Sequence, residues 1–225
     1  MSLPPGQREL RGFPRFGLGG RPPSVPTDPH IEIDGAVTPP FAVTVAALAR
    51  LPRREVIADF HCVSGWSATG LRWEGVSFAD FYADLVRPHL AGGAEVSHLV
   101  VEGRDGYRSV VTIEDALGED VLLADRLDGK PLGSDHGAPV RLVSPAQYGF
   151  ISTKHLCRIE LHTSEPRIRY HPSLRAHLGL QLVKPHPRAR VAREERHRYL
   201  PSWLVRPVYR GVIGRIKAQN ARDSG

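Results

Sequence analysis

Glycine and proline recur so often along this chain that short strands and turns are favoured over long helices. The 225 residues include 22 Gly and 20 Pro, which together make almost a fifth of the sequence. Both residue types interrupt regular elements and mark turns, so a helical bundle is not expected. Hydrophobic residues make up 41% of the chain, enough for a packed core in a domain of this size.

Short apolar or alternating runs, separated by turns, indicate a series of strands. Thr44 and Ser77 stand where they can cap two short helices. We therefore predict an α+β fold, strand-rich, with mixed sheets and short helices. One expected strand lies in HIEIDGAV (30–37), where Ile31 and Ile33 alternate with polar residues and a turn follows at Asp34-Gly35. The others are EVIADFHC (55–62), HLVVEG (98–103), YRSVV (107–111), VLLA (121–124), PVRLV (139–143) and LCRIEL (156–161).

Composition divides the chain into three parts. Residues 1–29 are rich in Pro, Gly and Arg and are expected either to form an extended arm laid over the body or to be partly disordered. Residues 30–165 form the predicted domain, and residues 166–225 form a basic tail. From Lys184 to the end there are 11 Lys or Arg and 3 Asp or Glu, a net charge of +8, whereas the rest of the chain has a net charge of −2.

Within the tail, apolar pairs recur every four residues from Leu204 to Ile216, while Arg206, Arg210 and Lys217 fall outside that stripe. The pattern indicates an amphipathic helical segment, weakened by one Pro and two Gly. Three interpretations stay open: a helix docked on its own domain, a helix that docks to a partner protein, or attachment to an anionic membrane surface. Nucleic acid is an unfavoured partner because no recognised binding module accompanies the charge.

The cellular location follows from what the sequence does not contain. No apolar run reaches 18 residues, and the first ten residues, MSLPPGQREL, do not follow a secretory signal pattern. Two cysteines allow at most one disulfide. A cytoplasmic protein is therefore expected.

Cys62 stands in the stretch DFHCVSGWS (59–67), and its residues leave four interpretations. Free Cys is often a small core residue. A nucleophile would need a base other than the adjacent His61, because strand neighbours point to opposite faces. Zinc is disfavoured because the paired ligand spacings are missing. A single thiolate ligand to a metal whose other ligands come from a cofactor needs no cluster.

Four ordered segments then resemble the molybdopterin-binding domain of the sulfite oxidase family. HCVSGWS with LRWEGVSFADF is similar to its C-V-x-x-W-S and W-x-G-V stretches, and DGYRSVV (105–111) to its D-G-Y segment. DVLLADRLDGKPLGSDHGAPVRLVSPAQYGF (120–150) and STKHLCRIEL (152–161) resemble the stretches that follow. Each segment alone is weakly specific, but four in order, covering about residues 30–165, make a strong signal.

The resemblance assigns roles to individual residues. Cys62 matches the molybdenum ligand and is the expected catalytic and metal-binding residue. Hydrogen bonds around a ligand tune it, so the neighbouring His61 is expected to act on the Cys62 thiolate in this way and is counted with the cofactor-binding residues. His136 and Arg141 match positions that contact the pterin. Ser152 and Lys154 match the S-x-K segment that holds the pterin and its phosphate, which agrees with the affinity of Arg and Lys for phosphate.

The implied activity is that of a molybdenum–molybdopterin oxidoreductase, which transfers an oxygen atom to or from a small oxyanion or sulfoxide-type substrate. No C-x-x-C-H haem motif occurs, so a separate electron-transfer partner is expected. The chain departs from the family at Ile151, where a lysine is usual, and at His155, where tryptophan is common. A non-catalytic binding module that docks through the basic tail is the alternative, and a cysteine-dependent hydrolase or transferase is a further one.

Overall fold

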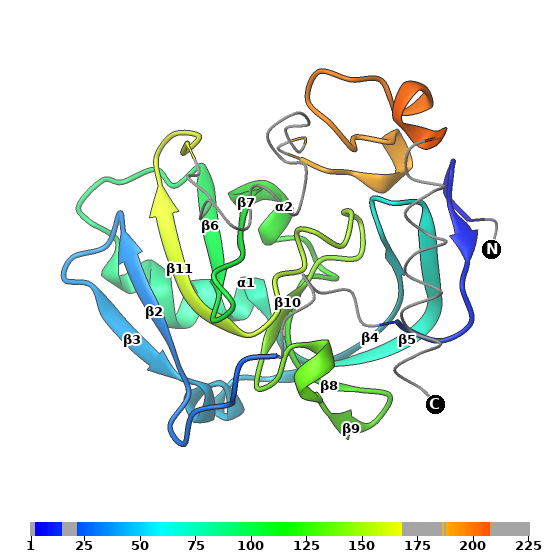
Figure 1. The fold of residues 1–225 in the computed structure, drawn as a ribbon. Coiled ribbons are helices and arrows are strands. Elements are labelled where there is room, and N and C mark those ends of the chain that lie inside the picture. Colours follow the sequence, from blue (N-terminus) through cyan, green and yellow to red (C-terminus); the bar gives the residue numbers. More distant parts are fainter. Residues whose placement is uncertain (1–2, 15–21, 168–185, 187, 208–225) are drawn as a thin grey trace.

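The expected short strands assemble into two sheets in a computed structural model, which describes residues 3–14, 22–167, 186 and 188–207. The sheets face each other across the main core (Figure 1). Sheet A contains β1 (Arg8–Glu9), β4 (Arg53–His61), β5 (Trp66–Ser77), β8 (Leu122–Leu127), β9 (Lys130–Pro131) and β10 (Arg141–Val143). Sheet B contains β2 (His30–Gly35), β3 (Phe41–Thr44), β6 (His98–Gly103), β7 (Arg108–Thr112) and β11 (Leu156–His162).

Helices are short, as predicted. Thr44 Oγ1 accepts a hydrogen bond from the Ala47 amide at the start of the 3-10 helix Val45–Arg50. Ser77 likewise caps α1 (Phe78–Phe81). The remaining helices are a π-helix (Tyr82–Val86), three 3-10 helices (Arg87–His89, Ser134–His136 and Val191–Arg193) and α2 (Ile113–Ala116). The fold class predicted from the sequence, strand-rich mixed sheets with short helices, is confirmed.

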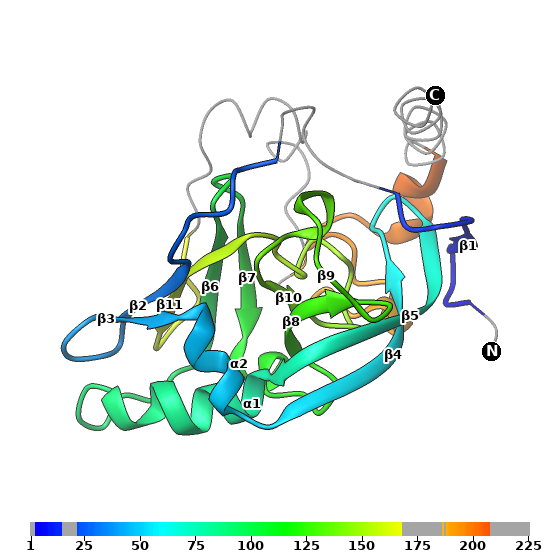
Figure 2. The ribbon, with the colours of Figure 1, turned by 90° about the horizontal axis from the view of Figure 1, so that it is seen from below.

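Sheet B is built around a parallel pair of strands that are distant in sequence. β2 and β11 run parallel, with Ile33 opposite Ile159, while β6 pairs antiparallel with the other side of β11. Alternation along β2 places Ile31 and Ile33 in the main core. Figure 2 shows sheet B on one side of the molecule and β4 with β5 on the other, and β8 and β10 between them.

A second, smaller apolar cluster lies at sheet A and contains Cys62. Its rings are Trp66 and Trp73 from β5, both nearly fully buried, with Phe60 from β4 and Phe13 from the N-terminal arm packed against them. The Phe13 ring lies 4.9 Å from the Phe60 ring and 5.7 Å from the Trp73 ring, centroid to centroid. We refer to Phe13, Phe60, Trp66 and Trp73 as the aromatic cluster.

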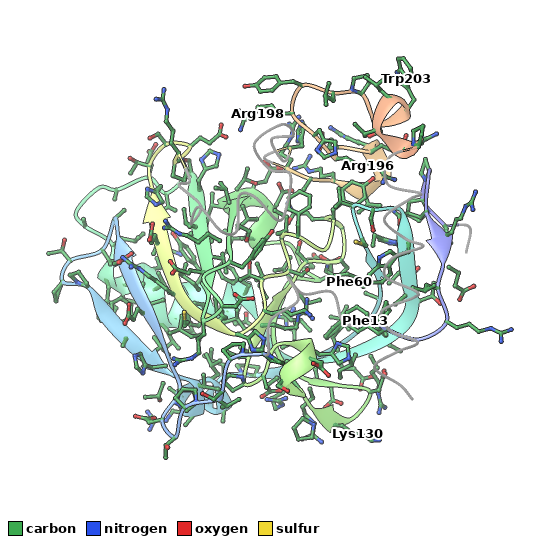
Figure 3. All side chains as sticks on the ribbon, in the orientation of Figure 1. Phe13, Phe60, Lys130, Arg196, Arg198 and Trp203 are labelled. Carbon is green, nitrogen blue, oxygen red and sulfur yellow. The ribbon has the colours of Figure 1, made fainter. Side chains whose placement is uncertain are left out.

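Segments from both sides of the predicted domain pack against it. β1, from the predicted arm, pairs in parallel with the start of β5. Residues 188–207, from the stretch assigned to the basic tail, bury Ala189, Val191 and Arg196 against the domain. A helix starts at Ser202, and Trp203 points outward from it (Figure 3). The remainder of the predicted amphipathic stretch, from residue 208 onward, lies outside the described residues. Within the ranges described, no helix is long and apolar enough to span a membrane.

Candidate functional site

Cys62 occupies a tight turn between β4 and β5. Its amide donates to the Trp66 carbonyl at 2.8 Å, and its own carbonyl accepts from the Gly65 amide at 2.9 Å. The Cys62 side chain is buried in the apolar cluster, and its Sγ lies 3.1 Å from Ser64 Oγ. The turn therefore fixes the thiol in a dry environment beside the aromatic cluster.

Electrostatics separates two of the roles considered for Cys62. Burial raises the pKa of its thiol, while the hydrogen bonds with Ser64 and the charge of Arg196 lower it. Because a thiol kept protonated by burial is a poor nucleophile, the geometry does not favour the hydrolase interpretation. A bound metal cation would favour the thiolate directly, so the site is suited to a metal ligand.

His61 reaches the Cys62 turn through a chain of hydrogen bonds. Its Nδ1 lies 2.7 Å from Ser67 Oγ, which donates to Gln7 Oε1 at 3.1 Å. Gln7 Nε2 in turn donates to the Cys62 carbonyl at 3.2 Å. Burial lowers the pKa of His61, so the ring is neutral at pH 7. His61 is thus tied to the turn that carries Cys62 and not, among the described residues, to the sulfur.

Arg141 is the most deeply buried of the predicted cofactor-binding residues. It begins β10, has no exposed surface, and its guanidinium lies 5.6 Å from the Phe60 ring centroid and 5.1 Å from that of Trp73. It donates to the carbonyls of His136 at 3.0 Å and Ser152 at 2.8 Å. Burial lowers its pKa to about 9. Within the described part of the chain, no carboxylate forms an ion pair with it.

His136 lies against the same aromatic cluster. Its ring stacks on Phe13 with 4.7 Å between centroids and an interplanar angle of 11°. Burial first, then the charges of Lys154 and Arg141, lowers its pKa to about 4, so the ring is neutral at pH 7. Gly137 follows with a φ of +106°, and a Cβ there would come within 3.0 Å of Lys154 Cβ. Glycine at this position therefore lets the loop lie directly on Lys154.

Ser152 and Lys154 complete the group from the irregular segment that precedes β11. Besides accepting from Arg141, Ser152 is buried and its Oγ accepts from the Ser144 amide at 3.2 Å. Lys154 Nζ donates to the Asp135 carbonyl at 2.7 Å, in the turn that carries His136. The structure thus brings His136, Arg141, Ser152 and Lys154 together around one loop.

The aromatic cluster connects this group to Cys62. Phe60 lies beneath Arg141, Phe13 stacks on His136, and both pack against the apolar cluster that contains Cys62. Figure 3 shows Phe13 and Phe60 close together in the interior. Cys62, His136 and Arg141 thus lie at the aromatic cluster. Ser152 is joined to it through Arg141, and Lys154 through the turn that carries His136. His61 is one hydrogen-bond chain away from the Cys62 carbonyl.

Unsatisfied polar groups at this location fit a molybdopterin. His136 Nδ1 and Trp66 Nε1 are buried without a hydrogen-bond partner within the described ranges. Arg141 adds a buried cation without a paired anion. Buried donors and charges are normally satisfied, so these groups predict a polar, anionic ligand. A pterin edge with a phosphate supplies both hydrogen-bonding atoms and negative charge, and we conclude that the residues present fit the group.

Two departures from the family pattern have a structural explanation. Ile151 is buried in the main core, so this side chain lies in an apolar environment. His155 adopts a φ of +53° and its Nδ1 lies 2.8 Å from the Ala138 carbonyl, which ties the His136 loop to the start of β11. The apolar run HLCRIEL (155–161) predicts that Cys157 is an inert core residue, and the predicted core burial is wrong. The register shifts between Leu156 and Arg158, so Cys157 is only half-buried, although its pKa is raised to about 11 by burial.

Sequence reasoning missed several residues that border the site. Phe13 and Gln7 belong to the N-terminal arm, whose sequence matches no motif of the family well enough to assign cofactor contacts. Phe60 lies in a predicted strand, and nothing in the sequence around it indicates its contacts with Phe13 and Arg141. Arg196 is 1% exposed although it stands in a stretch of charges that reads as solvated. A three-membered His, Cys, Asp or Glu cluster able to hold a metal does not occur in the described ranges.

The Oxidoreductase molybdopterin binding domain family model matches residues 20–170. The chain belongs to this family. An oxidoreductase of Bacillus subtilis, YuiH, is 30% identical over 159 residues, which cover 70% of this chain and 78% of that relative. The catalytic subunit of the protein-methionine-sulfoxide reductase MsrP from Gluconobacter oxydans is 31% identical over 173 residues, covering 68% of this chain but only 55% of MsrP.

A solved structure agrees with the fold. The sulfane dehydrogenase SoxCD from Paracoccus pantotrophus superposes with a TM-score of 0.52 at 22% identity, over 60% of this chain and 38% of that one. The predicted membership in a molybdopterin-binding oxidoreductase family is therefore confirmed, and the protein is an enzyme of that family. The non-catalytic alternative is not favoured.

Proposed function

We propose that this protein is a molybdenum–molybdopterin oxidoreductase that transfers an oxygen atom to or from a small sulfoxide-type or oxyanion substrate, with Cys62 as the protein ligand to molybdenum. The observation that carries the proposal is the position of a buried thiol beside unsatisfied donors and an unpaired buried cation. A sulfoxide-type substrate is suggested by the name of the MsrP relative.

The chain's own residues would hold and orient the cofactor. Arg141 presents a rigid fork of donors and Lys154 a compact charge, which suits phosphate and pterin oxygens. His136, neutral at pH 7, can exchange a single hydrogen bond through Nδ1. Ser152 fixes the loop that carries these groups. When bound, the cofactor supplies the two-electron chemistry of oxygen-atom transfer.

The surroundings determine how Cys62 can act. The aromatic cluster excludes water from the thiol, so a metal–thiolate bond there would be screened little by solvent. The hydrogen-bond chain from His61 through Ser67 and Gln7 holds the Cys62 carbonyl and therefore the turn. A separate electron-transfer partner is part of the proposal, and the cytoplasmic location stays a prediction from the sequence.

Metal analysis with two cysteine variants tests the proposal. Protein purified from a host that makes the cofactor is expected to contain about one molybdenum per chain, with a thiolate-like sulfur in its X-ray absorption spectrum. Cys62→Ser should remove that sulfur and abolish sulfoxide reduction, while part of the pterin is retained through Arg141 and Lys154. Cys157→Ser is the matched control, because Cys157 lies at the β11 bulge and should leave both properties unchanged.

Wild-type protein that stays free of molybdenum under these conditions would contradict the proposal and favour the binding-module alternative. Loss of activity on Cys62 alkylation in metal-free protein would instead favour the hydrolase interpretation.

A further inference from the structure

Arg196 is a buried cation that the family domain does not account for. It lies outside residues 20–170, in the segment 188–207, yet its side chain is only 1% exposed. Burying a guanidinium costs several kcal/mol unless its donors and charge are satisfied. The contacts of Arg196 therefore indicate what this burial achieves.

Those contacts converge on the turn that carries Cys62. One terminal nitrogen of Arg196, Nη1, donates to the carbonyl of Val63, the residue directly after Cys62. The other, Nη2, donates to the Gly6 carbonyl at 3.3 Å. The guanidinium lies 5.1 Å from the Tyr148 ring centroid, and Nη2 lies 3.8 Å from Glu194 Oε1. Arg196 thus joins the Cys62 turn to the N-terminal arm.

The arm holds the same turn from its other side. Gln7, next to Gly6, donates to the Cys62 carbonyl. The carbonyls of residues 62 and 63 are thus each fixed by a side chain from outside the core domain. A Cβ at Gly6 would lie 2.8 Å from Arg196 Nη2, and Gly6 has a φ of +71°, so glycine permits this close approach.

The peptide planes on both sides of a residue determine where its side chain points. The turn between β4 and β5 contains only residues 62–65. The Cys62 carbonyl, which Gln7 holds, lies in a peptide plane that flanks Cys62, and the Val63 carbonyl, which Arg196 holds, lies in the next plane. In a turn this short, fixing the second plane limits how far the first can rotate, and with it the Cys62 Cα–Cβ bond. We infer that Arg196 is a positioning residue for Cys62: together with Gln7 it clamps the ligand turn from two segments outside the domain. Only the effect of Arg196 on molybdenum rests on the proposed function, because the contacts that hold the turn are present without the cofactor.

Arg196 can act on Cys62 in two ways. Its hydrogen bonds hold the turn, which is the geometric part of the clamp, and its positive charge acts on the sulfur and the metal, which is the charge part. Substitutions of Arg196 can separate the two. Arg196→Gln removes both the paired donors and the cation. Arg196→Lys keeps a cation but cannot reach two carbonyls with one fork. Arg198→Gln is the matched control, since Arg198, two residues along, pairs with Glu165 and not with the Cys62 turn. Figure 3 shows Arg196 and Arg198 at separate places on this segment.

Two measurements on the full-length protein test the geometric part. Hydrogen exchange at the amides of residues 62–66 is followed in protein from a host that cannot make molybdopterin. We expect exchange to accelerate about tenfold or more in Arg196→Gln and in Arg196→Lys, and to stay at the wild-type rate in Arg198→Gln. Gln7→Leu removes the hydrogen bond from Gln7 to the Cys62 carbonyl without altering Arg196, so it should also accelerate exchange at these amides. This variant replaces Arg196→Gln in the test if Arg196→Gln does not fold.

The charge part is tested on the cofactor-loaded enzyme. A cation near a thiolate-ligated metal stabilises its more electron-rich state, so Arg196→Gln should lower the molybdenum reduction potential and change the Mo(V) electron paramagnetic resonance signal. Arg196→Lys should restore the potential but not the exchange protection. Unchanged exchange at residues 62–66 in Arg196→Gln would overturn the clamp. Absence of molybdenum from wild-type protein would instead refute the proposed function and leave the exchange result standing.

Discussion

Replacing Arg141 with Met tests whether this residue serves the cofactor or the fold. Burial lowers the pKa of Arg141 from its ordinary value to about 9, which means that it disfavours the charged form by about 5 kcal/mol. Its hydrogen bonds to the carbonyls of His136 and Ser152 return about 1.5–3 kcal/mol each. Contact with the Phe60 and Trp73 rings returns about 1–2 kcal/mol more. The contributions nearly cancel in the absence of a ligand.

Arg141→Met should therefore change the free energy of unfolding of the cofactor-free protein by less than about 3 kcal/mol, because it removes the desolvation cost together with the bonds. The effect on the cofactor should be large. Losing a charge-assisted bond to an anion costs about 1.5–3 kcal/mol, which weakens binding roughly 10- to 150-fold. A stable protein that cannot retain its pterin is the expected signature.

Urea unfolding of the cofactor-free protein measures the first quantity, and pterin retained per chain after dialysis, measured by its fluorescence after oxidation, measures the second. Arg126→Met is the control, since Arg126 lies on β8 of the same sheet but is half-exposed and pairs with Glu74. The reasoning fails if Arg141→Met destabilises the cofactor-free protein by more than about 4 kcal/mol, or if it retains pterin as the wild type does.

Two further variants probe the same site. As the pH falls from 7 to 5, His136 takes up a proton in the unfolded chain (ordinary pKa 6.5) but not in the fold (pKa about 4), so stability is lost. This ring contributes about 2 kcal/mol of that loss. His136→Gln should reduce the loss by this amount in urea unfolding at the two pH values, and an identical loss would show that the ring is not responsible. A Cβ at Gly149 would lie 2.0 Å from the Phe60 ring, so Gly149→Ala should cost about 1–3 kcal/mol and reduce pterin retention. At Gly92 no atom lies within 4 Å of an added Cβ, so Gly92→Ala should change neither stability nor pterin retention. The packing argument is refuted if Gly149→Ala and Gly92→Ala have the same stability and retain the same amount of pterin.

The elements that could be predicted from the sequence are those that local chemistry determines. Alternation in HIEIDG specifies β2, and the hydroxyls of Thr44 and Ser77 specify the helix starts that the structure shows. Strand pairing is not local. Nothing near residue 30 or residue 160 indicates that β2 and β11 lie side by side in parallel, because the contact is decided by how the two sheets close around the main core.

The candidate site divides in the same way. Cys62, Arg141 and their companions could be named because their motifs lie in contiguous stretches that resemble a family. Arg196 could not, since a guanidinium in a charged stretch is normally solvated, and only its tertiary contacts with Val63 and Gly6 bury it. Cys157 was misplaced because a one-residue register shift, invisible in an alternating sequence, turns it away from the core.

The parallel pairing of β2 with β11 bears on the order of events during synthesis. β2 is made early but cannot find its partner until residues 156–162 have left the ribosome, and the Arg196 contact with the Cys62 turn forms later still. Contacts between distant segments are also slow to form. The site is therefore complete only after residue 196 has been made. A molybdopterin-delivering factor would accordingly recognise the folded domain and not a shorter nascent segment.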